Sequence, residues 1–186
     1  FFPNVRPGIH CVKMMYWIPQ DKIVQMQDNV DYNKWVEDGW MRVFDGNVVE
    51  YDLICADITK ELEKYTPKHF AVDAKYFNSH VASHLKKVGW FDYITPVGQG
   101  FILSDAVSQM EVWTAKKEID FMGNPVLKWN FANVMLTVGT VGGKYPNKEK
   151  STNKIDGVSA LVTGVHELLR LGGLPDKLPP TIEIWN

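Results

Sequence analysis

Apolar residues recur at helical spacing in several stretches of the chain. The clearest stretch is 155–171, where the apolar residues sharing one side are Ile155, Val158, Leu161, Val162, Val165, Leu168 and Leu169. The Gly172-Gly173 pair follows and is expected to end this helix. The same spacing predicts helices over 51–65, 78–87 and 104–117. Asp31 and the pair Asn124-Pro125 are typical helix starts, so shorter helices are expected from each of them.

Short runs of apolar and β-forming residues between these helices predict strands. The runs are 10–17, 22–27, 40–44, 69–73, 91–96 and 133–138. Helices that alternate with buried strands are typical of an α/β fold. Prolines at positions 175, 179 and 180 forbid a further helix, so 174–186 is expected to be an extended tail.

Composition narrows the class of protein. A chain of 186 residues with 45% hydrophobic composition can bury the core of one domain, and a formal net charge of −2 argues against a protein that coats nucleic acid non-specifically. No apolar run approaches the roughly 20 residues that span a bilayer. Cys11 and Cys55 have neither zinc nor disulfide spacing, and the histidines lack a metalloprotease motif and are interpreted as surface residues. No phosphate-binding loop is present, so no ATPase domain is expected on this chain.

Two aspartates are candidate metal ligands. Asp73 ends a predicted buried strand, and ligands gather beyond the carboxyl ends of strands in α/β sheets, although Asp is also a common turn residue. Asp156 lies in the first turn of the last helix, where the helix dipole alone favours a carboxylate. The small side chains of Ser159, Ala160 and Thr163 on the same face would let a nucleic acid strand come close. Residue positions alone leave both interpretations open.

A lysine-rich segment leads directly into Asp156. Its basic residues are Lys144, Lys148, Lys150 and Lys154. They could attract DNA phosphates beside a metal ligand, or they could simply solvate an exposed loop. The adjacent carboxylate favours the first interpretation.

Two blocks of sequence carry a resemblance to a known family. They are Asn-Pro-Val-Leu-Lys-Trp at 124–129 and Lys-Ser-Thr-Asn-Lys-Ile-Asp-Gly at 150–157, and weaker segments lie at 16–19, 31–39, 72–73, 98–101 and 133–134. Taken in order, they resemble the nuclease domain of the large terminase subunit of tailed bacteriophages. The resemblance covers most of the chain up to about residue 172.

The resemblance implies an RNase H-like fold of the RuvC and integrase type, with a mixed central sheet flanked by helices. It also implies two Mg²⁺ or Mn²⁺ ions held by an acidic cluster to which Asp73 and Asp156 belong. The family's first metal-binding Asp sits on the strand before the one containing Ile9 to Trp17, and this chain does not contain it. Residues 1–186 are therefore expected to be a single nuclease domain without its first strand, from the C-terminal part of a longer protein, and weakly active or inactive alone.

The expected function is metal-dependent endonuclease cleavage of the concatemeric phage genome during DNA packaging. The resemblance implies double-stranded DNA, the terminase small subunit and the portal protein as partners, in the cytoplasm of the bacterial host and with no membrane. Two alternatives stay open. One is a non-catalytic module that clamps DNA for packaging, and the other is a resolvase or integrase-type nuclease of the same fold.

Overall fold

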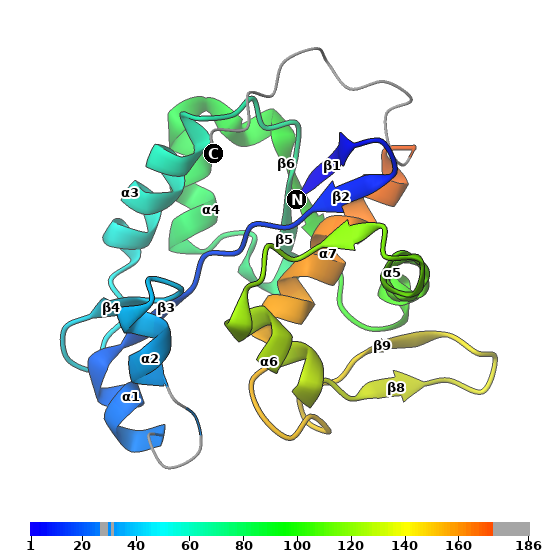
Figure 1. Ribbon diagram of the computed structural model, residues 1–186. Coiled ribbons are helices and arrows are strands. Elements are labelled where there is room, and N and C mark those ends of the chain that lie inside the picture. Colours follow the sequence, from blue (N-terminus) through cyan, green and yellow to red (C-terminus); the bar gives the residue numbers. More distant parts are fainter. Residues whose placement is uncertain (27–29, 31, 173–186) are drawn as a thin grey trace.

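Short strands and the helices that cover them make up the fold (Figure 1). The computed structural model describes residues 1–26, 30 and 32–172. The strands are β1 (Phe2–Arg6), β2 (Ile9–Cys11), β3 (Trp17–Pro19), β4 (Arg42–Phe44), β5 (Phe70–Asp73), β6 (Ile94–Val97), β7 (Ile119–Asp120), β8 (Leu136–Val138) and β9 (Lys144–Pro146). The α-helices are α1 (Gln20–Met26), α2 (Tyr32–Glu37), α3 (Tyr51–Leu62), α4 (His80–Leu85), α5 (Ser104–Lys116), α6 (Pro125–Asn133) and α7 (Asp156–Arg170).

The strands pair in small separate sheets. Strand β2 lies between β1 and β7, antiparallel to β1 and parallel to β7. Strand β3 pairs in parallel with β4, β5 pairs in parallel with β6, and β8 forms an antiparallel hairpin with β9. The mixed α/β architecture is confirmed. The described residues do not form a single continuous central sheet. The strands are two to five residues long, and the four sheets share no hydrogen-bonded strand.

The long helices begin and end close to their predicted limits. Helix α6 starts as the Asn124-Pro125 pair predicts, since the Asn124 side chain accepts a hydrogen bond of 2.8 Å from the Leu127 N–H. Helix α5 ends at Lys117, which adopts a left-handed conformation with φ of 59°. Helix α2 also has its predicted bounds, while Asp31 and the tail 174–186 lie outside the described residues.

One predicted strand is wrong. The segment 22–27 belongs, up to Met26, to helix α1. Among residues 22–25, whose burial is described, only Ile23 is buried and Val24 is 57% exposed, so the side chains do not alternate between two faces as those of a strand would. The expected strand 10–17 is also divided, with β2 and β3 at its ends and irregular chain between them. Short mixed patterns do not distinguish helix from strand.

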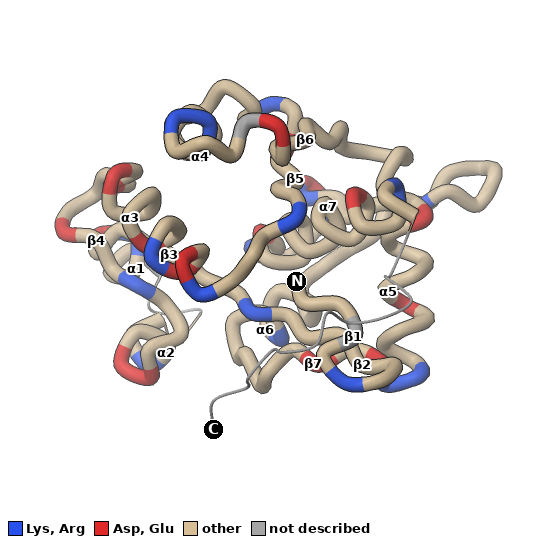
Figure 2. Tube along the Cα trace, turned by 90° about the horizontal axis from the view of Figure 1, so that it is seen from above, with Lys and Arg blue, Asp and Glu red and all other residues tan. Residues whose placement is uncertain are grey.

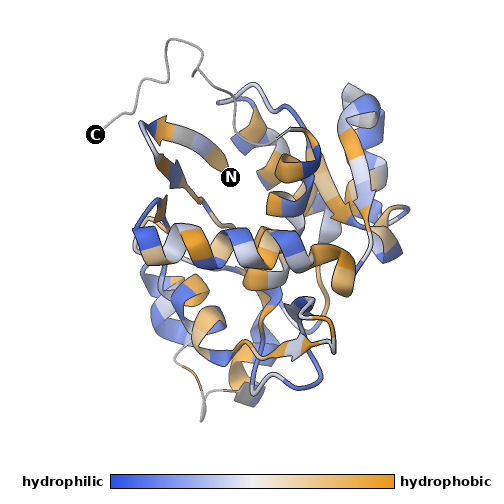
Figure 3. Cartoon of the chain, turned by 90° about the vertical axis from the view of Figure 1, so that its right-hand side faces the viewer, coloured by the Kyte–Doolittle hydropathy of each residue, from blue (hydrophilic) through white to orange (hydrophobic). Residues whose placement is uncertain are grey.

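The core lies mainly between α5, α7 and the strands beside them. Helix α7 contributes Val158, Leu161, Val162 and Val165, all nearly inaccessible to solvent. The alternation of hydrophilic and hydrophobic bands along the helices reflects this one-sided burial (Figure 3). A second cluster, formed by Ile23, Val30, Tyr32, Met41 and Val126, packs α1 and α2 against α6. No helix within the described residues has the length and apolar character needed to cross a membrane.

Candidate metal and DNA-binding site

Asp156 opens helix α7 with its side chain turned to solvent. The side chain is 63% exposed, and the Lys148 ammonium contacts its Oδ1 atom. The carboxylate also lies at the positive end of the helix dipole, which stabilises its charge. Asp156 therefore presents an accessible carboxylate whose contact in the structure is the Lys148 ammonium.

The first turn of α7 is held in place from helix α6. The side-chain oxygen of the buried Asn130 accepts a hydrogen bond of 2.7 Å from the Gly157 N–H. A Cβ atom at Gly157 would lie closer than 3.0 Å to both Asn130 Oδ1 and Tyr16 Oη. Only glycine fits at this position, so the Asp-Gly pair reflects close packing rather than flexibility.

The negative charge of Asp156 acts on two tyrosines, Tyr16 and Tyr32. Burial, and secondarily the negative charge of Asp156, raise the pKa of Tyr16 well above its ordinary value, and the same two causes raise the pKa of Tyr32. The Tyr16 hydroxyl is fully buried and has no hydrogen-bond partner among the described residues. Both phenols therefore keep their protons to a higher pH than an exposed tyrosine does.

Asp73 ends strand β5 and caps the turn that follows. Its Oδ1 atom accepts a hydrogen bond of 2.9 Å from the Lys75 N–H, at the start of the 3-10 turn Ala74–Tyr76. This is the turn role that its position in the sequence also allowed. The half-buried side chain remains at the carboxyl end of the strand, where a ligand is expected in an α/β fold.

The direction of the packed elements relates the two aspartates. Helix α7 packs against β5 and β6, and two side-chain hydrogen bonds fix the relative direction: Thr95 to Glu167 at 2.7 Å, and Gln99 to Thr163 at 3.5 Å. The strands therefore run opposite to the helix, and their carboxyl ends lead toward its N-terminal half. Asp73 pairs with Val97, two residues before Gln99. That Asp73 and Asp156 share one metal site stays a prediction.

The two aspartates are the candidate metal ligands among the described residues. No group of three or more His, Cys, Asp or Glu side chains among them is arranged to hold a metal ion. The two aspartates are hard oxygen donors, the kind that Mg²⁺ and Mn²⁺ prefer. By donor chemistry they fit a divalent ion, and a complete cluster would need at least one further ligand.

The four candidate DNA-binding lysines do not behave alike. Lys148, Lys150 and Lys154 are exposed, as predicted, and Lys148 and Lys154 line a shallow depression with Asp156. Lys144 instead lies in strand β9, is largely covered, and contacts Glu111 on α5. Its assignment to an exposed loop is therefore wrong, because pairing with β8 extends the hairpin as far as Pro146.

Asn147 organises the segment that carries these lysines. Its side-chain oxygen accepts hydrogen bonds from the Glu149 N–H at 2.9 Å and the Lys150 N–H at 3.0 Å. The Asn147 carbonyl also accepts a bond from the Ser151 hydroxyl. Asn147 was not among the predicted site residues, although an Asn that starts a polar turn is a recognisable local signal.

Charge elsewhere on the chain is mixed. Figure 2 shows basic and acidic residues scattered over the trace rather than gathered on one face.

The expectation that all histidines are surface residues is wrong for His10, which is 2% exposed and packs edge-on against Trp113. Alternating strand burial places His10 on the core side of β2.

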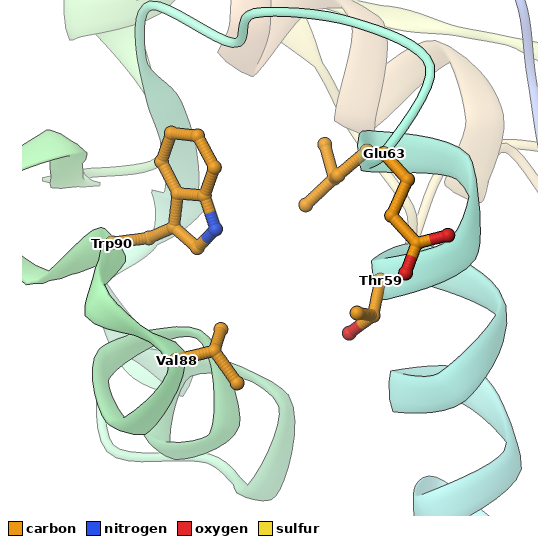
Figure 4. Close-up of a pocket in the computed structure, with 5 residues that line it drawn as sticks. Thr59, Glu63, Val88 and Trp90 are labelled. Carbon is orange, nitrogen blue, oxygen red and sulfur yellow. The ribbon is translucent and has the colours of Figure 1, made fainter.

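A second hollow lies between the end of α3 and the segment Lys86–Trp90. Thr59, Glu63, Val88 and Trp90 line it together with Leu62 (Figure 4). It shares no residue with the depression at Asp156. Its lining carries one carboxylate and one hydroxyl, so it offers no set of groups for metal-dependent chemistry.

Comparison with known proteins decides the family. Residues 9–170 match the family model "Terminase large subunit, endonuclease domain". This chain belongs to that family. The match includes β5 with Asp73, the lysine-rich segment and α7 with Asp156, so the resemblance of the sequence to phage terminase nuclease domains is confirmed.

Relatives of this terminase nuclease domain are longer proteins. The chain is 29% identical over 168 residues to Protein YmfN of Escherichia coli (strain K12), covering 84% of the chain and 36% of that protein. It is 25% identical over 161 residues to the terminase large subunit of Enterobacteria phage HK97, covering 85% of the chain and 32% of that protein. The chain thus spans about a third of the length of the curated relatives it matches.

A solved structure has the same fold. The crystal structure of the HK97 bacteriophage large terminase superposes with a TM-score of 0.78 at 24% sequence identity, covering 88% of this chain and 35% of that one. The agreement extends to the arrangement of helices and small sheets. This likeness shows that the two proteins share a fold.

Proposed function

We propose that this terminase nuclease domain is a metal-dependent DNA endonuclease of RNase H-like fold that cuts concatemeric phage DNA during packaging. The observation that carries the proposal is the exposed Asp156 at the start of α7, next to Lys148, inside the region that matches the family. A carboxylate and a phosphate-attracting ammonium at one point of the surface suit the hydrolysis of a phosphodiester.

The proposed metal ligands are Asp73 and Asp156, with Mg²⁺ or Mn²⁺ as the ion. A bound pair of such ions lowers the pKa of an attacking water and stabilises the leaving oxygen. Asp156 presents its oxygens from a helix start whose position Asn130 fixes. The neighbouring Ser159 and Ala160 are small, so they leave space for a DNA strand.

Lys148 would have two successive partners. It now neutralises Asp156, and a cation bound to that carboxylate would replace it. The released ammonium would then contact a DNA phosphate, together with the exposed Lys150 and Lys154. DNA and metal are thereby expected to bind better together than either does alone.

The proposal extends to the biological setting. Residues 1–186 would form one nuclease domain of a longer packaging protein, since the family match runs without interruption from 9 to 170. Its substrate would be double-stranded DNA in the cytoplasm of the bacterial host. Its partners would be the terminase small subunit and the portal protein, which the membership of the family implies.

Nicking of supercoiled plasmid DNA by the intact protein that carries these residues tests the proposal. We expect Mn²⁺-dependent cleavage that falls to background in Asp73→Asn and in Asp156→Asn, because each substitution keeps the size and removes the charge. Asp105→Asn is the matched control, since Asp105 is also exposed in the first turn of a long helix. Cleavage by Asp156→Asn equal to that of the control would reject Asp156 as a metal ligand, whereas an unmodified protein without Mn²⁺-dependent cleavage would favour the DNA-clamping module.

A further inference from the structure

The buried hydroxyl of Tyr16 is an unexplained feature of the candidate site. It comes from the Tyr-Trp-Ile-Pro segment, and it reaches the first turn of α7 so closely that no side chain fits at Gly157. It has no hydrogen-bond partner among the described residues. A phenylalanine would fill the same space without burying an unsatisfied polar group.

Neighbouring groups at this turn do not use the hydroxyl. The Asn130 side-chain oxygen accepts the Gly157 N–H, and Asp156 turns its Oδ1 atom toward Lys148. The charge of Asp156 nevertheless acts on the phenol, since it contributes to the raised pKa of Tyr16. The hydroxyl lies against Gly157, the residue that follows Asp156, and makes no hydrogen bond to the carboxylate that Lys148 contacts.

We propose that Tyr16 is a positioning residue whose hydroxyl donates a hydrogen bond to the Asp156 carboxylate when that carboxylate binds a divalent cation. The inference rests on the proposed function. A carboxylate that ligates a metal through one oxygen leaves the other to accept a hydrogen bond, and such outer partners fix the orientation of the ligand. Tyr16 can supply this hydrogen bond from a fixed position, because its ring packs directly against Gly157.

The Tyr16 hydroxyl is expected to contribute differently to the metal-free and the metal-bound protein. Without metal it makes no hydrogen bond to the part of the chain that the structure describes, so its removal should not lower the stability of the fold. With metal it orients a ligand, so its removal should weaken binding of the ion. A purely structural tyrosine would show the opposite combination.

Tyr16→Phe in the intact protein tests this inference with two readouts. The Mn²⁺ dissociation constant is measured from the electron paramagnetic resonance signal of free Mn²⁺, and the melting temperature is measured in EDTA. We expect Mn²⁺ affinity to fall about 10- to 100-fold, as for other outer-shell partners, and the metal-free melting temperature to stay at or above that of the unmodified protein. Tyr51→Phe is the control, since Tyr51 is half-exposed on α3 and stacks on His80.

Asp156→Asn separates the two proposals. If it weakens Mn²⁺ binding while Tyr16→Phe does not, the positioning role is overturned and the proposed metal site stands. If Asp156→Asn leaves Mn²⁺ affinity unchanged, both are overturned. A Tyr16→Phe protein that loses metal-free melting temperature assigns the hydroxyl to folding and also overturns the positioning role.

Discussion

At the scale of single residues, the packing of the candidate site restricts the choice of amino acid at Gly157. Its missing side chain lets Tyr16 and Asn130 meet the first turn of α7. We expect Gly157→Ala to destabilise the fold by about 1–3 kcal/mol, because the added methyl overpacks a buried contact and pushes the turn away from Asn130. Urea denaturation followed by tryptophan fluorescence measures the free energy of unfolding.

Gly164 provides the matched control in the same helix. An added Cβ there meets no atom within 4 Å. Gly164→Ala should therefore stabilise the protein by roughly 0.5–1 kcal/mol, since alanine restricts the unfolded chain and favours a helix. Equal effects of the two substitutions would show that close packing does not require glycine at position 157.

At this scale the sequence points to the two candidate acids and not to the residues that pack around them. Asp73 and Asp156 were recognisable because strand ends and helix starts are local features. Tyr16 and Asn130 act on residues far along the chain, at Gly157, and no spacing reveals such a contact. Lys144 was assigned to a loop because the turn after Val138 hides the second strand of a short hairpin.

At the scale of elements, Glu167 joins helix α7 to the pair β5 and β6. Its buried carboxylate accepts bonds of 2.6 and 2.7 Å from Arg170 and one of 2.7 Å from Thr95. His69, just before β5, lies 3.5 Å away. Bonds from Arg170 lower the pKa of Glu167 below its ordinary value despite burial, and Thr95 and the charges of Arg170 and His69 add to this effect.

This lowered pKa predicts a pH dependence of stability. A group whose pKa is lower in the folded than in the unfolded state stabilises the fold above its unfolded pKa, here 4.5, and this contribution is lost as the pH falls through the folded value. Glu167→Gln should therefore destabilise the protein by about 1–3 kcal/mol at pH 7, and this difference should shrink as the pH falls below 4.5. Thermal melts from pH 7 to 3, with exposed Glu149→Gln as control, measure this; parallel curves would contradict it.

The elements themselves were predictable in proportion to their length. Helices α5 and α7 repeat an apolar face over three turns or more, and their limits follow from the pattern. Helix α1 was mistaken for a strand because Ile23 is the single buried position among its residues of described burial, 20–25. The division of the strands into small sheets could not be predicted, since it depends on which distant segments pair.

At the scale of the whole molecule, a net charge of −2 requires DNA binding to depend on local lysines. Replacing Lys148 and Lys150 by alanine should reduce the slope of log Kobs against log salt by about 2, since each phosphate contact releases about 0.9 counterion. Fluorescence anisotropy with a labelled duplex between 50 and 200 mM salt, about the range in which such contacts matter, measures the slope. The control replaces two other exposed lysines, Lys87 and Lys116. A slope equal to that of the control would assign the segment to solvation.

Helix α7 is the last of the described elements to be synthesised, so it packs after the others have been made. The elements against which α7 packs, among them β5, β6, α5 and α6, all precede it in the sequence. Asp156 and its supports Tyr16 and Asn130 therefore come together only after residues near 170 have left the ribosome. A chain that ends before α7 lacks the assembled candidate site, so any chemistry of that site has to wait until this last helix has been made.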